Sequence, residues 1–370
     1  MKKIASFFMY IFICVSLLSG CNNQEAEGLS IAIVTSLSGI DDRSFNQNNY
    51  EGIRTFISAN PGSTVRHIQE PTGDIYAAVL YVKKIAGDYD VIVMPGFQFS
   101  GIGVVAASHP QTKFILIDAH PDRVDEEYYH ANVRAITFAE QESGFFAGIA
   151  AAMETQTGYV AFIGGQAFPA VVNYQFGFES GINYANKNFG TMAELIQLPQ
   201  YYGTDVRGIN IGGNYTNDFS APEKGRAIAL ELMDMGADII FVAAGGTGEG
   251  VFEAVKEHSN TVMVIGVDVD QFDDGQTSDR NIVLTSAIKR MDLNVHRSLE
   301  SLAEGTFAGG NYTMHADSDS TGVVTTLGRH QMSTQTVNRI HELFGLLRDG
   351  LIVPASNFNG FAPNRFPGLN

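Results

Sequence analysis

The sequence predicts an α/β protein of two lobes, each built on a doubly wound parallel sheet. From residue 29 onward, short β-branched runs alternate with longer stretches that carry apolar residues at helical spacing. The short runs are almost continuously hydrophobic, as in strands whose sheet is covered by helices on both faces. The alternation restarts after an extended segment at 131–138, and a chain of this length suits about two domains. Two βα series therefore indicate two lobes.

The predicted elements follow this alternation in chain order. A helix at 44–59, for example, places Ile53, Phe56 and Ile57 on one face. In the first series, strands are predicted at 31–35, 91–94 and 114–118, and helices at 44–59 and 74–87. In the second series, strands are predicted at 159–163, 193–198, 238–242 and 262–268, and helices at 140–153, 171–185, 222–235 and 248–257.

The chain is predicted to cross between the lobes more than once, because no Pro-, Gly- or Ser-rich linker separates the two series. A final helix at 334–348 is expected to complete the second lobe. The predicted N-terminal lobe comprises 29–134 and 280–304, and the predicted C-terminal lobe comprises 135–279 and 305–370. The hinge of several crossing segments is predicted near 131–138, 271–281 and 304–307.

Residues 1–20 are typical of a lipoprotein signal peptide. Lys2 and Lys3 precede an apolar run at 4–18, which is too short to span a bilayer. Cleavage after the Leu-Ser-Gly that follows would leave Cys21 as the N-terminus, with a thiol and an amine available for acylation. Because two or three acyl chains anchor a protein where one does not, we expect a lipid anchor in the cell membrane, facing the periplasm or the outside. Residues 21–28 would form a tether, and an ordinary signal peptide is the alternative.

The composition narrows the class of partner. Residues 1–20 contain two lysines and no acidic residue, so the rest of the chain carries 21 basic and 40 acidic side chains. This balance argues against nucleic acids and anionic ligands, whose recognition needs clustered Lys and Arg. Cys14 lies within the signal, so with Cys21 lipidated no thiol remains for a disulfide, a metal site or a nucleophile.

Candidate ligand residues follow the predicted strands, because ligands of open parallel sheets bind beyond the carboxyl ends of the strands. Polar or aromatic side chains occupy these positions in both series: Asp42, Asn46, Phe97 and Asp118 in the first, and Asp268 in the second. One aspartate at a strand end is commonly a helix cap. Several that meet at one edge favour a ligand site.

A glycine-rich turn at 244–250 lies between a predicted strand and helix, where phosphate loops occur. Val251 stands where a dinucleotide fingerprint needs its third glycine, and no Lys follows Gly250 as a P-loop requires. The turn could be purely structural. Alternatively, the bare backbone at Gly245 and Gly246 lets a ligand approach the N-terminus of the next helix.

Eight short motifs occur one after another over about residues 30–355. They are DRSFNQ at 42–47, FILID at 114–118, ESGFFAG at 142–148, YVAFIGG at 159–165, GFESG at 177–181, AAGGTGEGVFEA at 243–254, IGVDVDQ at 265–271 and LTSAIKR at 284–290. Each is weak alone, but together they resemble the basic membrane protein family of lipoproteins, of the PnrA-like purine nucleoside receptor type. The resemblance implies a type I periplasmic-binding-protein fold and the role of solute receptor for an ABC importer.

The resemblance also implies roles for individual residues. Asp42, Asn46 and Asp118 would bind the edge of the base, and Asp268 and Lys289 would bind the ribose hydroxyls. The remaining candidates would add backbone contacts or aromatic rings. The full set of candidate ligand-binding residues is Asp42, Phe45, Asn46, Phe97, Asp118, Tyr215, Gly245, Gly246, Asp268 and Lys289.

A purine nucleoside, namely adenosine, guanosine or inosine, suits the chemistry of these residues. Its flat base can stack on Phe97 or Tyr215, which contributes about 1–3 kcal/mol per base. Carboxylates accept hydrogen bonds from the base edge and the ribose, and such charge-assisted bonds are roughly twice as strong as neutral ones. Nucleotides should be rejected, since their phosphates would meet several carboxylates and only Lys289 as a cation. The other expected partners are an ABC permease and the membrane, with no cofactor, no metal and a monomeric chain.

Three alternatives remain at this point. A receptor of the same fold could bind another polar solute, such as a sugar or an autoinducer. An exported nucleoside-processing enzyme could use paired aspartates for acid–base chemistry or calcium, but the sequence contains no Gly-x-Ser-x-Gly or His-Glu-x-x-His motif. An adhesin or structural lipoprotein would not need the polar residues at the strand ends.

Overall fold

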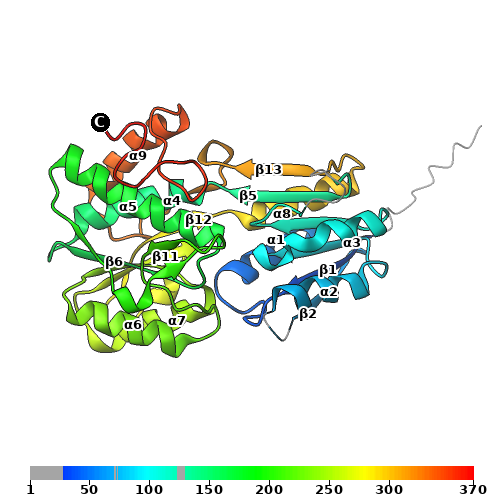
Figure 1. Cartoon of the computed structure of the whole chain (residues 1–370), viewed down its shortest axis with the longest axis horizontal. Coiled ribbons are helices and arrows are strands. Elements are labelled where there is room, and N and C mark those ends of the chain that lie inside the picture. The colour runs from blue at the N-terminus through cyan, green and yellow to red at the C-terminus, as the bar shows by residue number, and fades with distance from the viewer. Residues whose placement is uncertain (1–27, 71, 73, 123–129) are drawn as a thin grey trace, which may run out of the picture.

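The structure, a computed structural model, describes residues 28–70, 72, 74–122 and 130–370. Two lobes lie side by side in Figure 1, each with a central sheet between layers of helices. Both main sheets have six strands, which confirms the predicted α/β class. The predicted signal at 1–20, Cys21 and nearly all of the tether lie outside the described residues.

The first sheet has the strand order β13-β5-β4-β3-β1-β2, and all of its strands are parallel. Its strands are β1 (Ser30–Thr35), β2 (Thr64–Gln69), β3 (Val91–Pro95), β4 (Lys113–Ile117), β5 (Val133–Phe138) and β13 (Gly310–Met314). One core packs α1 (Phe45–Ala59) and α8 (Met291–Ala303) against one face of this sheet. A second core packs α2 (Ile75–Ile85) and α3 (Gly103–Ser108) against the opposite face.

The second sheet has the order β14-β12-β11-β10-β6-β7, and only β14 is antiparallel. Its strands are β6 (Tyr159–Gly164), β7 (Glu194–Ile196), β10 (Ile239–Ala243), β11 (Met263–Asp268), β12 (Val283–Lys289) and β14 (Thr321–Val323). Figure 1 shows α4 (Glu140–Glu154), α5 (Pro169–Phe189) and α9 (Thr334–Arg348) on one side of it, and α6 (Pro222–Asp234) and α7 (Gly248–His258) on the other.

Shorter elements complete the described chain. β8 (Gly203–Thr204) and β9 (Asn210–Gly212) form a small antiparallel pair. The 3₁₀ helices are η1 (Phe97–Ile102), η2 (Pro199–Tyr201), η3 (Gly245–Thr247), η4 (Asp273–Gly275) and η5 (Ala316–Ser318). None of the described helices combines the length and apolarity that a membrane span requires.

Within the described residues the chain passes between the lobes three times, at positions that correct the predicted boundaries. Residues 283–289, expected in the first lobe, form β12 of the second sheet, and Gly310–Met314, expected in the second lobe, form β13 of the first. The crossings therefore lie between β5 and α4, between β12 and α8, and between β13 and β14. The predicted boundaries at 134, 279 and 304 are too early, because β5 continues to Phe138 and the chain forms β12 and β13 before it crosses. The returns of α8 to the first lobe and α9 to the second agree with the prediction.

Glycines allow α4 and α5 to cross at close range. A Cβ atom built on Gly148 would collide with the carbonyl of Phe178, and one on Gly181 would collide with the carbonyl of Phe145. Gly144 and Gly177 face the opposite backbone in the same way. The two helices therefore pack with their backbones in contact.

We expect Gly148→Ala to destabilise the protein by about 1–3 kcal/mol, because the added methyl overpacks this contact. Gly345→Ala in α9 is the matched control, since nothing lies within 4 Å of its added Cβ. There alanine should stabilise by about 0.5–1 kcal/mol through helix propensity. Urea unfolding followed by circular dichroism measures both values. Equal effects of the two substitutions would contradict the close packing of α4 on α5.

Candidate functional site

A cavity lies between the lobes, at the carboxyl ends of both sheets. The first lobe lines it with Ser36, Ser38, Asp42, Phe45, Asn46, Gly96, Phe97, Gln98 and Asp118. The second lobe lines it with Phe168, Ala170, Val171, Tyr174, Phe219, Ala243, Gly245, Val267, Asp268 and Lys289. The structure thus brings all the candidate ligand residues to this cavity except Tyr215 and Gly246.

The lobes are closed on the cavity, because side chains bond across it. Ser44 Oγ of the first lobe donates to Asp268 Oδ2 of the second at 2.9 Å. Ser38 Oγ donates to the carbonyl of Phe219 at 3.1 Å. The Lys289 ammonium, at the end of β12, lies 2.5 Å from Asp118 Oδ2, just after β4.

Two aspartates at strand ends have the same unusual backbone. Asp118 follows β4 with φ 62°, and Asp268 ends β11 with φ 66°. Left-handed backbone is uncommon for residues other than glycine, although aspartate and asparagine tolerate it better than most. Such strain persists only where the surrounding structure enforces it, and it is concentrated at ligand sites. At both positions it turns a carboxylate toward Lys289 in the cavity.

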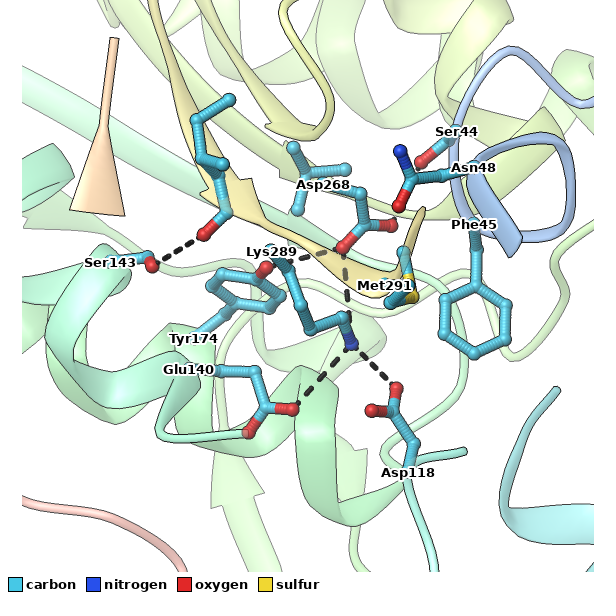
Figure 2. A network of polar contacts seen from close by, with 12 residues as sticks. Ser44, Phe45, Asn48, Asp118, Glu140, Ser143, Tyr174, Asp268, Lys289 and Met291 are labelled. Carbon is cyan, nitrogen blue, oxygen red and sulfur yellow. Dashed lines mark hydrogen bonds and ion pairs between the residues drawn. The ribbon is translucent and has the colours of Figure 1, made fainter. Parts of the chain in front are cut away.

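Asp118, Glu140, Asp268 and Lys289 form the acid–lysine cluster, shown in Figure 2. Lys289 Nζ lies 3.5 Å from Glu140 Oε1 and 3.9 Å from Asp268 Oδ1, in addition to its contact with Asp118. The Tyr174 hydroxyl donates to Asp268 Oδ1 at 3.1 Å. All four members of the cluster are at least nine-tenths buried, so one ammonium faces three carboxyl groups away from water.

Burial sets the protonation of the cluster. It raises the pKa of Glu140 to about 7, against the opposing effect of Lys289. It also raises the pKa of Asp118. Burial disfavours the charge on Lys289, but the carboxylates of Asp118, Asp268 and Glu140 outweigh it and raise the pKa of the ammonium. The cluster thus holds a permanent cation and at least one carboxyl group that titrates near neutral pH.

In the part of the chain that is described, no group of His, Cys, Asp and Glu is arranged to hold a metal ion.

Sequence reasoning missed Glu140 and Tyr174. Glu140 begins α4 directly after the first crossing, and an acidic residue in the first turn of a helix is already explained by the helix dipole. Its Oε2 atom accepts a hydrogen bond from Asn173 Nδ2 at 3.0 Å, which fixes the carboxyl group beside Lys289. Tyr174 lies within α5, where its pattern is typical of core packing. Lys289, by contrast, was identified, because it lies in the LTSAIKR motif at 284–290 that contributes to the family resemblance.

The carboxylate of Asp42 organises its own loop. It accepts hydrogen bonds from the backbone N–H groups of Ser44, Asn46 and Gln47 at 3.2, 2.9 and 3.0 Å. Burial nevertheless raises the pKa of Asp42 to about 6. Because these bonds occupy much of its accepting capacity, Asp42 is better placed to fix the start of α1 than to bind the edge of a base.

Two buried oxygen atoms in the cavity are open to a ligand. Among the described groups, the buried Oδ1 atoms of Asn46 and Asp118 have no hydrogen-bond partner, so each can accept a hydrogen bond from a ligand.

Three phenylalanines form what we call the aromatic wall: Phe97, Phe168 and Phe219. The ring of Phe97 in the first lobe lies 5.3 Å from that of Phe168 in the second, and Phe168 lies 5.9 Å from Phe219. Phe45 lines the cavity beside the acid–lysine cluster, with its ring 5.0 Å from Lys289 Nζ. In the second sheet Lys289 ends β12 and Phe168 follows β6, with β11 and β10 between these two strands, so the cavity has a charged end and an end at the aromatic wall.

The structure corrects the expectation for Tyr215. Its ring lies in the core of the second lobe, packs against Phe162, and is 1% exposed. Its hydroxyl donates to Gln175 at 2.7 Å. Tyr215 bridges Gly164 at the end of β6, which turns its side chain inward, away from the cavity. Phe219, four residues later, lines the cavity in its place.

The two glycines of the predicted turn are in different positions. Gly245 lines the cavity with φ 54°, a conformation that favours glycine. Gly246 lies beside the carbonyl of Phe219, outside the cavity lining. A backbone contact with the ligand therefore remains possible at Gly245 but not at Gly246.

Comparison with known proteins identifies relatives over most of the chain. Residues 30–197 and 207–341 match a family described as Bmp, ABC transporter substrate-binding protein PnrA-like. A CD4+ T-cell-stimulating antigen of Listeria innocua is 31% identical over 347 residues, covering 89% of this chain and 88% of the relative. The ABC transporter nucleoside-binding protein BmpA of Lactococcus lactis is 28% identical over 337 residues, covering 84% and 87%. Basic membrane protein A of Borreliella burgdorferi is 30% identical over 295 residues, covering 78% of each chain.

Solved structures share the fold. An ABC transporter solute-binding protein from Aeropyrum pernix K1 has a TM-score of 0.75 at 22% identity and covers 90% of this chain and 94% of its own. The lac repressor dimer bound to operator has a TM-score of 0.51 at 15% identity and covers 80% and 93%. These likenesses confirm the predicted type I periplasmic-binding-protein fold.

Proposed function

The chain belongs to the PnrA-like family of ABC transporter substrate-binding proteins, and from this premise we propose that its solute is a purine nucleoside, namely adenosine, guanosine or inosine. The family is one of solute-binding proteins and not of enzymes. The observation that carries the proposal is the division of the cavity into a charged end and an aromatic end. A nucleoside has the same division, since it joins a polyol to a flat aromatic base.

The ribose binds at the acid–lysine cluster. Asp268 and Asp118 accept hydrogen bonds from its hydroxyls, and Lys289 donates to a hydroxyl oxygen while balancing the carboxylates. This arrangement revises the role expected for Asp118, because its carboxylate lies against Lys289 and not with the residues of the aromatic end. Hydrogen bonds to charged groups contribute about 1.5–3 kcal/mol each, so this end supplies much of the affinity.

The base binds at the aromatic wall. Phe97 comes from the first lobe and Phe168 and Phe219 from the second, so the closure of the lobes brings rings from both lobes together into one wall for the base. Ser36, Ser38 and Gln98 offer uncharged polar groups at the same end. The name of the Lactococcus lactis relative, a nucleoside-binding protein, supports this choice of solute over a sugar or an autoinducer.

Delivery to an ABC permease follows from closure. The bonds across the cavity from Ser44 and Lys289 exist only when the lobes are together, so ligand binding and the relative position of the lobes are linked. A permease can recognise that position. Acylation of Cys21 would hold the receptor at the membrane where the permease lies.

We expect calorimetry to show binding of at least one of adenosine, guanosine and inosine, with no binding of free bases, ribose or nucleoside monophosphates at the same concentration. A free base has no ribose hydroxyls to bond to the acid–lysine cluster. The phosphate of a nucleoside monophosphate would be repelled by the carboxylates of that cluster. Thermal melting in the same buffers is the control for folding. Heat with ribose or another sugar and none with the three nucleosides would favour the sugar receptor instead.

A further inference from the structure

We infer that the site also takes purine nucleosides that carry a substituent at C6 of the base, an inference that rests on the proposed function. A second cavity adjoins the first at its aromatic end. The two cavities share Ser36, Ser38, Gln98, Phe168 and Phe219 as lining residues. Asp118, Asp268 and Lys289 line only the first cavity. The second cavity therefore continues from the end that receives the base.

The strand order of both sheets places the second cavity away from the hinge. In the first lobe the second cavity is lined by Thr35 at the end of β1 and by Glu70 just after β2. Asp118 of the cluster follows β4, which is next to β5, the strand after which the chain crosses to the second lobe. In the second lobe it comes from Gln166 after β6, whereas Lys289 ends the crossing strand β12. Acid–lysine cluster, aromatic wall and second cavity thus follow one another across the cleft.

The geometry of a purine nucleoside then determines which atom faces the second cavity. The sugar is attached at N9 of the five-membered ring, and the C6 edge of the six-membered ring is the far side of the base. With the ribose on the acid–lysine cluster, a substituent at C6 points past the aromatic wall. Ala78 and Phe99 provide apolar lining there, while Asp74 and Asp218 disfavour an anionic group. The substituent is therefore neutral or cationic.

The test compares three ligands by calorimetry on the wild-type protein. The first is whichever parent binds among adenosine, guanosine and inosine. The second is its C6-substituted form, namely N6-benzyladenosine, O6-benzylguanosine or O6-benzylinosine, and the third is its 2′,3′-O-isopropylidene form, which caps the ribose hydroxyls. We expect the benzyl form to bind within about tenfold of the parent and the isopropylidene form to lose at least about 100-fold. A benzyl form that loses more than tenfold overturns the inference while the proposed function stands.

A variant tests whether the substituent lies in the second cavity. Ser220, on an exposed loop, lines that cavity and not the first. Ser220→Trp should lower the ratio of benzyl-form affinity to parent affinity by at least about tenfold. An unchanged ratio would place the substituent elsewhere and overturn the inference. If none of the three parents binds to folded protein, the proposed function has failed and the inference falls with it.

Discussion

Replacing Asp268 by asparagine is expected to weaken nucleoside binding by at least about 100-fold. The carboxylate accepts hydrogen bonds from Ser44 and Tyr174 and faces Lys289, so it is fixed at the end of the cavity where the ribose binds. Two hydrogen bonds from ribose hydroxyls to a charged acceptor contribute roughly 3–6 kcal/mol, and about 1.4 kcal/mol corresponds to a factor of ten. Asparagine keeps the shape of the side chain and tolerates the left-handed backbone at φ 66°. The loss therefore reports on the charge and not on backbone strain.

The matched control is Asp273→Asn, in η4 of the same lobe. Asp273 is 83% exposed and pairs with Arg329 at the surface, so its substitution should leave nucleoside affinity unchanged. Isothermal titration with the tightest-binding nucleoside measures both variants, and their melting temperatures establish that each is folded. Affinity of Asp268→Asn within a few-fold of the wild type would remove Asp268 from the ribose site.

The strand-end aspartates could be predicted because their positions depend on one local fact, the point where a buried apolar run stops. Asp118 and Asp268 both end such runs, and in parallel sheets all these ends meet at one edge. Lys289 also ends a strand, but β12 was not predicted from the pattern, and only the resemblance to a known family identified the residue. The fold class was predictable for the same reason as the aspartates, since the alternation of strands and helices repeats along the whole chain.

Of the three rings in the aromatic wall, Phe97 was predicted, but Phe168 and Phe219 could not be, because the direction of a side chain in an irregular loop depends on distant contacts. Tyr215 and Phe219 lie in one loop, and both are aromatic. Tyr215 points inward because its backbone bridges Gly164, whose missing side chain leaves room for the ring; a Cβ atom there would lie 2.6 Å from it. The partner of Tyr215 is thus some fifty residues away in sequence, and no periodicity connects the two. Edge strand β2 was missed because only Ile68 of its six residues is buried, which leaves little hydrophobic pattern.

Replacing Lys289 by methionine is expected to destabilise the protein by about 3–5 kcal/mol at pH 8, since it leaves buried carboxyl groups without their cation. Lys289 is 2% exposed and is shared by Asp118, Glu140 and Asp268. Lys224→Met is the matched control, because that ammonium pairs with Asp218 at 2.9 Å on the surface. An exposed pair of this kind contributes at most about 1 kcal/mol. Urea unfolding of both variants gives the two free energies of unfolding.

The loss in Lys289→Met should depend on pH in a direction that burial dictates. Burial raises the pKa of Glu140 from 4.5 to about 7, so between these values the folded state holds a proton that the unfolded state has released. The contribution of Glu140 to the free energy of unfolding is therefore fully present below pH 4.5 and is lost as the pH rises through 7. Without the ammonium, which lowers the pKa values of Glu140 and Asp118, both carboxyl groups should keep their protons to higher pH. The variant should thus be close to wild-type stability near pH 5 and lose most by pH 8. A loss of equal size at both pH values would mean that Lys289 contributes by packing and not by charge.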